Sequence, residues 1–221
     1  MICITGDTLG DYYDLLNRIE PYSLGKQDIL VVCGDFGFVW SSKRIEQYLN
    51  ELMKLPFTIA FADGNHEDFD LLETYPVQDW NGGKVHKISD NIFHLMRGYI
   101  FTIEQKTFFI MGGAYSIDKA YRQEGKSWWK QEIPANEDYN TANASLKKCD
   151  YSVEYVITHT LPESVIFALG CYPDIHDREL TGYLDWLRGR LKFKNWFGGH
   201  FHVDKKVSNI YVLYNDVIKI Q

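Results

Sequence analysis

Side chains that commonly bind metal ions recur in this sequence directly after short apolar runs. Oxygen donors and imidazoles occur together in the set, a mixture that suits Mn, Fe, Zn or Co better than Ca, which prefers oxygen ligands alone. His200 and His202 are two residues apart, so both rings would point to the same side of an extended segment. The set consists of Asp7, Asp35, Asn65, His66, His159, His200 and His202.

Single members of this set have simpler explanations. A Gly-Asp pair such as Gly6-Asp7 is common after a strand, where it often forms a turn or caps a helix, and a lone Thr-His carries little information. The segment from Gly199 to His202 is stronger, because paired histidines behind two glycines are hard to explain by packing. Five such endings in one chain favour a common metal site over five unrelated turns.

The apolar runs have the composition of buried strands, and helical patterns lie between them. The runs cover residues 1–5, 29–33, 57–61, 153–157 and 193–197. Apolar residues recur at helical spacing in residues 12–19, from Ser41-Ser42 to just before Pro56, and from Leu180 to Leu191. This alternation predicts an α/β fold with largely parallel strands, and in such sheets the functional site lies beyond the carboxyl ends of the strands.

Two further regions predict strands of another kind. Residues 84–88, 91–95, 98–103 and 107–111 form a close succession of strand patterns with short turns, which indicates an antiparallel run. The C-terminal residues 206–220 predict two more strands around Asn215-Asp216. Two sheets with helices outside are therefore expected, within a single domain over residues 1–221. The polar residues 116–150 are expected to form an excursion over one edge of the cleft.

Composition excludes several function classes. The 221 residues carry a net charge of −7, so the chain lacks the basic footprint of a protein that binds nucleic acid in bulk. An acidic protein that handles phosphates needs local positive charge, which bound metal would supply. The four cysteines form no CxxC pair, and no signal peptide or membrane-spanning run is visible, so a cytoplasmic protein with reduced thiols is expected. The oligomeric state is left open.

The ordered motifs resemble the calcineurin-like metallophosphoesterase superfamily. That family's pattern is D-x-H, GD, GNH[DE], H and GHxH, and the matching positions here run from Asp7 to His202. The resemblance implies a four-layer α/β/β/α sandwich around two mixed sheets, in agreement with the strands and helices predicted above. It also implies a small bacterial or phage-type hydrolase that acts on a phosphoester.

The resemblance further implies a dinuclear site with two divalent ions, of which Mn, Fe or Zn are favoured. Asp35 would bridge both ions, while Asn65 would also lie near the substrate. A metal-bound hydroxide would attack phosphorus, and His66 would be the general acid beside the leaving group. The ligands implied are Asp7, Asp35 and His202 for the first ion, and Asp35, Asn65, His159 and His200 for the second.

Two positions depart from the family's pattern. Leu9 stands where the D-x-H motif has its histidine, and leucine has no electron pair to donate, so the first ion should bind more weakly than the second. Phe38-Val39 replaces the Asp-Arg pair of the protein-phosphatase branch, which argues against that branch. Another group would then have to orient His66, with Asp63, Glu67 or a backbone group as candidates.

Two functions from different classes follow from these residues. The first is a phosphoesterase that hydrolyses a phosphomonoester or phosphodiester, either a nucleotide or a small phosphorylated metabolite. Arg122 is a candidate phosphate contact because its planar fork suits phosphate, although a surface salt bridge explains it equally well. The alternative is a catalytically impaired scaffold or binding module, which Leu9 favours. Trp128 and Trp129 are expected to pack at the cleft edge, and His86 and His94 to lie in the core or at the surface.

Overall fold

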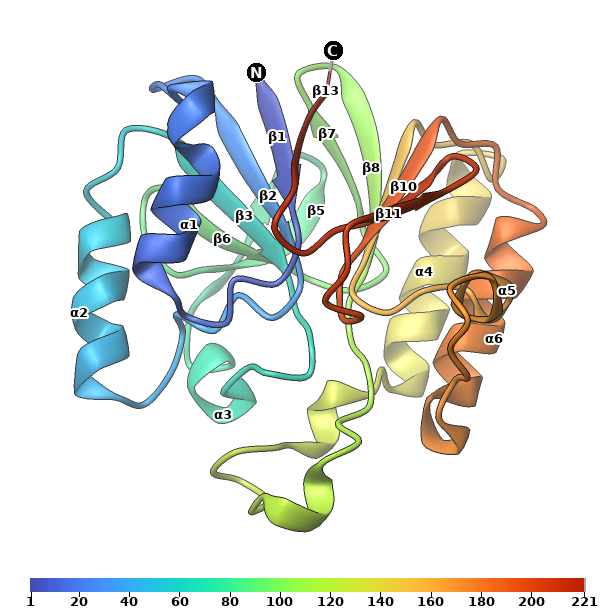
Figure 1. Ribbon diagram of the computed structural model, residues 1–221. Coiled ribbons are helices and arrows are strands. Elements are labelled where there is room, and N and C mark those ends of the chain that lie inside the picture. Colours follow the sequence, from blue (N-terminus) through green and yellow to red (C-terminus); the bar gives the residue numbers. More distant parts are fainter. Residues whose placement is uncertain (221) are drawn as a thin grey trace.

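The computed structural model describes residues 1–220, which form two mixed β-sheets packed face to face (Figure 1). The first sheet contains, in spatial order, β13 (Val217–Ile220), β1 (Ile2–Thr5), β2 (Ile29–Cys33), β3 (Thr58–Ala62), β6 (Ile92–Leu95), β5 (Gly83–Lys87) and β4 (Val77–Trp80). The second contains β11 (Lys205–Val207), β12 (Ile210–Val212), β10 (Asn195–Gly198), β9 (Tyr155–Thr158), β8 (Lys106–Met111) and β7 (Ile100–Ile103).

Helices cover the outer face of each sheet, so the predicted four-layer arrangement is confirmed (Figure 1). The first sheet is flanked by α1 (Tyr12–Ile19), α2 (Lys43–Leu52) and the short α3 (Phe69–Leu72). The second is flanked by α4 (Asn136–Lys148), α5 (Glu163–Ala168) and α6 (Arg178–Arg188). The helices predicted around residues 12–19, 43–55 and 180–191 are α1, α2 and α6. None of the helices within residues 1–220 is long and apolar enough to cross a bilayer.

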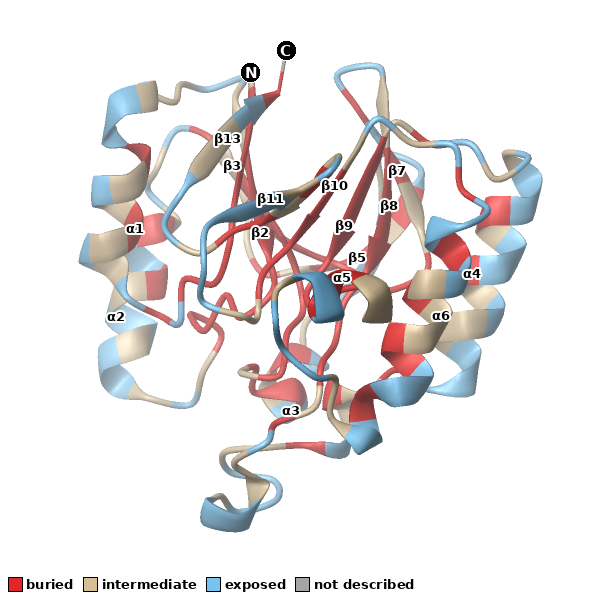
Figure 2. Cartoon of the chain, turned by 45° about the vertical axis from the view of Figure 1, so that its right-hand side comes forward, coloured by how far each residue is buried: buried red, intermediate tan, exposed pale blue. Residues whose placement is uncertain are grey.

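Apolar side chains fill the space between the sheets and the space under each helical layer. Figure 2 shows the strands as the buried part of the molecule. Val31 of β2 and Ile110 of β8 belong to the cluster between the sheets, while Leu30 of β2 packs with the helices outside. Strands buried on both faces read as continuous apolar runs rather than as alternating patterns, which is why these runs stand out in the sequence.

The central strands of both sheets run parallel. β1, β2, β3 and β6 pair in parallel in the first sheet, as do β8, β9, β10 and β12 in the second. All five strands predicted ahead of the metal-capable residues are present. Because carboxyl ends of parallel strands meet at one edge of a sheet, the polar residues behind these strands come together at the edge where the two sheets meet.

Two predictions about how the strands are arranged in the sheets were wrong. Residues 84–111 do not form one antiparallel run, because β5 and β6 pair in the first sheet whereas β7 and β8 pair in the second. The C-terminal residues form three strands instead of two: β11 and β12 make a hairpin whose turn contains Ser208 at a left-handed φ of 57°, and β13 returns to the first sheet. Strand periodicity does not reveal where a chain changes sheets.

The segment 116–150 divides into two parts. Residues 116–134 carry two short 3₁₀ turns, Lys119–Tyr121 and Lys130–Glu132, and lie beside the cleft. Residues 136–148 instead form α4, which packs Ala142 and Leu146 onto the second sheet. Because α4 contains few apolar residues, its sequence predicted a polar segment at the cleft edge instead of a helix. The short elements α3, α5 and β4 were not predicted either.

Candidate metal centre

His159, behind β9, provides a buried imidazole whose free nitrogen faces two oxygen donors. Its Nδ1 donates a hydrogen bond to the carbonyl oxygen of Cys33 at 2.9 Å, which fixes the tautomer because a carbonyl can only accept. In the neutral imidazole Nε2 therefore carries the lone pair, and this atom lies 3.3 Å from Asp35 Oδ1 and 3.1 Å from Asn65 Oδ1. The side chain is fully buried. This is the geometry expected of a preorganised metal ligand.

The Asn65 amide is oriented by a residue that sequence reasoning missed. Its Nδ2 donates to the hydroxyl oxygen of Ser116 at 3.0 Å, so Oδ1 is left to face His159. Ser116 is itself buried, and its backbone N–H donates to Glu132. Only the glycine pair upstream, Gly112-Gly113, hinted that this segment approaches the site closely.

Asp7, Asp35 and His159 place donor atoms within 4.8 Å of one another, and all three are buried. Neighbouring backbone packs directly on the carboxylates. A Cβ on Gly64 would lie 2.0 Å from Asp35 Oδ1, and one on Gly199 would lie 2.1 Å from Asp7 Oδ1, so only glycine fits at either position. This donor set and its tight backbone cradle fit a divalent metal ion.

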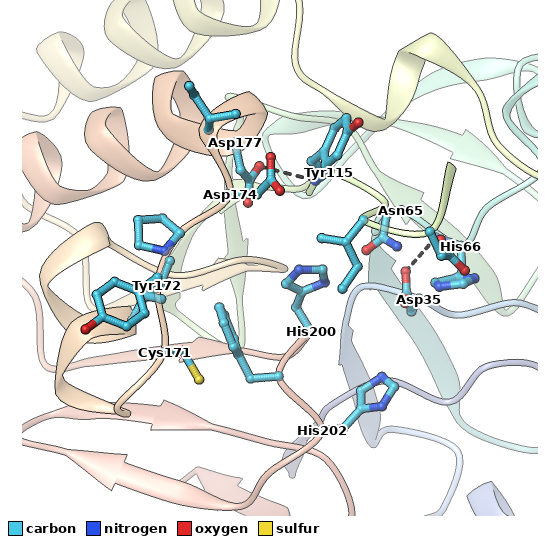
Figure 3. Close-up of a pocket in the computed structure, with 16 residues that line it drawn as sticks. Asp35, Asn65, His66, Tyr115, Cys171, Tyr172, Asp174, Asp177, His200 and His202 are labelled. Atoms are coloured by element: carbon cyan, nitrogen blue, oxygen red, sulfur yellow. Dashed lines mark hydrogen bonds between the residues drawn. The ribbon is translucent and has the colours of Figure 1, made fainter. Parts of the chain in front are cut away.

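His200 and His202 come from the turn after β10, and both line the same cavity (Figure 3). The backbone N–H of His200 donates to Asp7 Oδ1 at 2.9 Å, and its ring lies edge-on to that of His159 at a centroid distance of 5.0 Å. His202 Nε2 lies 3.1 Å from Asp7 Oδ2. The segment is not extended as predicted, because both histidines have left-handed φ values of 67° and 49°. Such conformations in non-glycine residues are uncommon and cluster at functional sites.

Burial and nearby charges set the protonation of these imidazoles. Burial, with the neighbouring His159, lowers the pKa of His200 to about 3, so this imidazole stays neutral and keeps a lone pair for a metal. Burial also opposes the charged form of His159, but the carboxylates of Asp35 and Asp7 outweigh it and raise the pKa of His159. The hydrogen bond from His202 to Asp7 raises the pKa of His202. The carboxylates thus attract positive charge, as a cation site requires.

Leu9 adds no donor to the predicted site of the first ion, which is the first half of the candidate centre. Its backbone N–H donates to the Asp35 carbonyl oxygen at 2.8 Å, which places the residue beside Asp35. Its side chain is 40% exposed and offers no donor atom. On the first half, Asp7, Asp35 and His202 therefore remain as the predicted ligands.

The His66 ring is contacted by Arg122, which the sequence suggested as a phosphate contact or a surface salt bridge. One guanidinium nitrogen, Nη2, lies 3.0 Å from His66 Nδ1 and 2.8 Å from its Nε2. Because it is nearly equidistant from both nitrogens, the guanidinium rests against the ring rather than on a single lone pair. Arg122 is also held by Asp118 at 2.8 Å and by the Ser127 carbonyl at 3.1 Å.

The two carboxylates considered for orienting His66 have other partners. Asp63 accepts hydrogen bonds from Arg97 Nε at 2.7 Å and pairs with His94 Nε2 at 3.1 Å. Glu67 accepts from the backbone N–H of Phe36 at 2.7 Å and so holds the loop that follows Asp35. Burial, together with the charge of Asp35, raises the pKa of Glu67 well above its usual range. The hydrogen bonds of Asp63 and Glu67 thus hold neighbouring backbone and side chains, and neither carboxylate contacts the His66 ring.

The remaining aromatic and histidine residues have structural partners. Trp129 is buried and meets Trp40 edge-on, with ring centroids 5.5 Å apart, while Trp128 lies under the Lys119 ammonium. His86 and His94 are buried, and their Nδ1 atoms are 2.9 Å apart. These observations confirm packing roles at the cleft edge and in the core.

A cavity of about 770 Å³ opens over the centre (Figure 3). One wall is formed by the metal-capable residues and the other by the segment around Tyr115 and the turn around Tyr172. This volume exceeds what a phosphate group needs and leaves room for an organic substituent.

The chain belongs to the calcineurin-like phosphoesterase family, whose model matches residues 1–204. Its members are in general metal-dependent phosphoesterases, and the cluster of Asp7, Asp35 and His159 is the corresponding candidate metal site. No curated protein matches the chain.

Solved structures share the fold at low sequence identity. A protein named as a 5′-nucleotidase from Staphylococcus aureus aligns at 14% identity with a TM-score of 0.50, covering 98% of this chain and 49% of that one. Phosphopantetheinyl hydrolase (PptH) from Mycobacterium tuberculosis aligns at 15% identity and a TM-score of 0.48, over 96% of this chain and 87% of that one. The chain thus spans about half the length of the nucleotidase. At these identities the similarity supports the fold alone.

Proposed function

We propose that this protein hydrolyses a phosphomonoester or phosphodiester of a nucleotide or small metabolite, with two divalent metal ions held between the sheets. The observation that carries the proposal is the convergence of Asp7, Asp35 and His159, whose donor atoms lie within 4.8 Å of one another in a buried setting. Asn65 and His200 complete the second half of the site, and His202 the first. Divalent ions in such a site polarise the phosphoryl oxygens and activate water.

His66 is the proposed general acid. It lines the cavity next to Asn65, and its backbone N–H is fixed by Asp35 Oδ1 at 2.7 Å. Burial lowers the pKa of the free imidazole, and Arg122 lowers it further. A bound phosphate would add negative charge beside the ring and attract Arg122 to itself, and both changes favour the protonated imidazole that a leaving oxygen requires.

The proposal is tested with metal-stripped protein titrated with Mn²⁺. Hydrolysis of p-nitrophenyl phosphate and bis-p-nitrophenyl phosphate would be compared for wild type and His66→Ala. We expect Mn²⁺-dependent hydrolysis that falls by about 10²-fold or more in the variant, because loss of a general acid typically costs that much. His176→Ala, which removes an exposed imidazole at the cavity rim, is the matched control. Hydrolysis that does not depend on added metal would contradict the proposal.

The second candidate function is a catalytically impaired scaffold that binds a partner at the candidate metal centre, and it rests on Leu9. It predicts no hydrolysis by the wild type and none by Leu9→His. Activity that is absent in the wild type but recovered in Leu9→His would instead identify an enzyme disabled at the first half of the centre.

A further inference from the structure

His66 lines two cavities. The first is the cavity of about 770 Å³ above the candidate metal centre. The second, of about 300 Å³, is lined by Leu9, Gly37, Trp40, Ile45 and His66. Among the described residues, His66 alone lines both. The proposed general acid therefore borders space for two organic groups.

The smaller cavity is apolar and its walls are fixed. Apart from His66, its side chains are those of Leu9, Trp40 and Ile45, which carry no charge. A Cβ on Gly37 would lie 2.7 Å from the Leu9 carbonyl carbon, so the two loops that form the floor are in direct backbone contact. Hydrogen bonds from Leu9 to the Asp35 carbonyl and from Gly10 to the Phe36 carbonyl hold the same loops together, at 2.8 Å and 3.1 Å.

The larger cavity has a different character. Apart from the metal-capable residues, it is lined by apolar side chains such as Ile117, Tyr172 and Ile175, and by the carboxylates of Asp118, Asp174 and Asp177. No lysine or arginine of residues 1–220 belongs to this lining. A second phosphate would lie against these carboxylates, so the cavity suits an uncharged organic group.

We propose that the substrate is a phosphodiester whose apolar leaving group occupies the smaller cavity against Leu9, Trp40 and Ile45, while its other, uncharged group lies in the larger cavity. This inference rests on the proposed function and assigns Leu9 to substrate recognition. A monoester has one organic group and would leave one of the two cavities to water, which gives no binding energy from the apolar walls.

The step balances as a hydrolysis. An oxygen–phosphorus bond forms from water, and the bond between phosphorus and the leaving oxygen breaks with its electron pair on that oxygen. His66 gives the leaving oxygen its proton, and a proton from the attacking water restores the imidazolium. One diester and one water yield a phosphomonoester and an apolar alcohol, with no oxidant or further reactant.

The test compares two esters with the same leaving group in Mn²⁺-loaded protein, p-nitrophenyl phosphate and bis-p-nitrophenyl phosphate. We expect kcat/KM for the diester to exceed that for the monoester by about tenfold or more. Trp40→Ala and Ile45→Ala should each raise KM by about fivefold for both esters, with little change in kcat, because both esters place the same p-nitrophenyl leaving group in the smaller cavity. Ile117→Ala, in the lining of the larger cavity, should raise KM for the diester alone. Val77→Ala, an exposed apolar residue on β4, is the control and should change neither ester.

The outcomes separate the two proposals. Preference for the monoester, equal effects of Ile117→Ala on both esters, or an unchanged KM in Trp40→Ala would overturn the diester assignment and leave the phosphoesterase intact. Failure to hydrolyse either ester, with Mn²⁺ shown by calorimetry to be bound, would overturn both. Mn²⁺ affinity that is unchanged in Trp40→Ala confirms that the variant is folded and that its effect concerns the substrate.

Discussion

The two halves of the proposed dinuclear centre, one for each predicted ion, differ in burial and in support. In the second half, His159 is fully buried and Asn65 nearly so, and each is held by a further partner, the Cys33 carbonyl or Ser116. In the first half, the side chain of His202 is 47% exposed and Leu9 is 40% exposed. The donors of the second half are thus preorganised before a metal arrives, whereas the first half is open and lacks one donor.

This difference has a physical consequence for metal affinity. Groups that orient a ligand commonly contribute 10- to 100-fold in affinity. The second half has such groups at His159 and Asn65. His202 stacks on Tyr214, with ring centroids 4.6 Å apart, and its one polar contact is with Asp7, which the metal would share. We therefore expect unequal affinities for the two ions, with the tighter ion in the second half.

Replacing one histidine of each half gives the largest expected effects. His200→Ala should lower Mn²⁺-dependent hydrolysis by about 10²- to 10³-fold, because it removes a ligand from the preorganised half. His202→Ala should lower it by about tenfold, since that half is already incomplete. Metal content by calorimetry should follow the same order. Equal losses, or the larger loss in His202→Ala, would show that the exposed half governs catalysis and that the comparison is wrong.

Leu9→His tests whether the open half lacks only a donor. An imidazole at this position should tighten the weaker Mn²⁺ equivalent by about tenfold or more and raise activity at limiting Mn²⁺, because one more nitrogen ligand is added. Calorimetric titration of stripped protein provides a measurement that does not depend on turnover. Leu9→Ala opens the same space without a donor and should leave the affinity unchanged. A gain in Leu9→Ala would mean that the leucine side chain, and not the missing ligand, weakens the site.

The same contrast shows what could be predicted from the sequence. The strands ahead of the candidate ligands were predictable because they are buried on both faces, and the convergence of Asp7, Asp35 and His159 because each follows such a strand. Ser116 orients Asn65 from 51 residues away, and apart from the glycine pair upstream nothing in its local sequence indicated this role. Arg97, which pairs with Asp63, carried no local signal. Periodicity describes one element at a time, so partners distant in the chain, changes of sheet and the weakly apolar α4 required the three-dimensional structure.

A buried polar network behind the second half explains how its loop is held. Asp63 directly precedes the segment from Gly64 to His66, and it pairs with Arg97 and His94. His94 in turn shares a hydrogen bond with His86, in which one Nδ1 must donate and the other accept. Charging both imidazoles would remove this hydrogen bond, so the support of the second half should be sensitive to acid.

His86 provides the smallest of these predicted effects. Burial, with the neighbouring His94, lowers the pKa of His86 from 6.5 to about 4 in the folded protein. Between pH 6.5 and pH 4, His86 is therefore protonated in the unfolded chain but neutral in the folded protein. The free energy of unfolding thus falls as the pH falls from about 6.5 to about 4. Urea unfolding at pH 7.5 and pH 5 should show a loss from this group of about 1–2 kcal/mol, less than the full shift because neighbouring groups relax. His86→Gln, which keeps a hydrogen-bond partner for His94 but does not titrate, should lose correspondingly less, whereas His176→Gln, at an exposed position, should behave as the wild type. If His86→Gln loses as much stability between pH 7.5 and pH 5 as the wild type, a group other than His86 causes the acid sensitivity of the network.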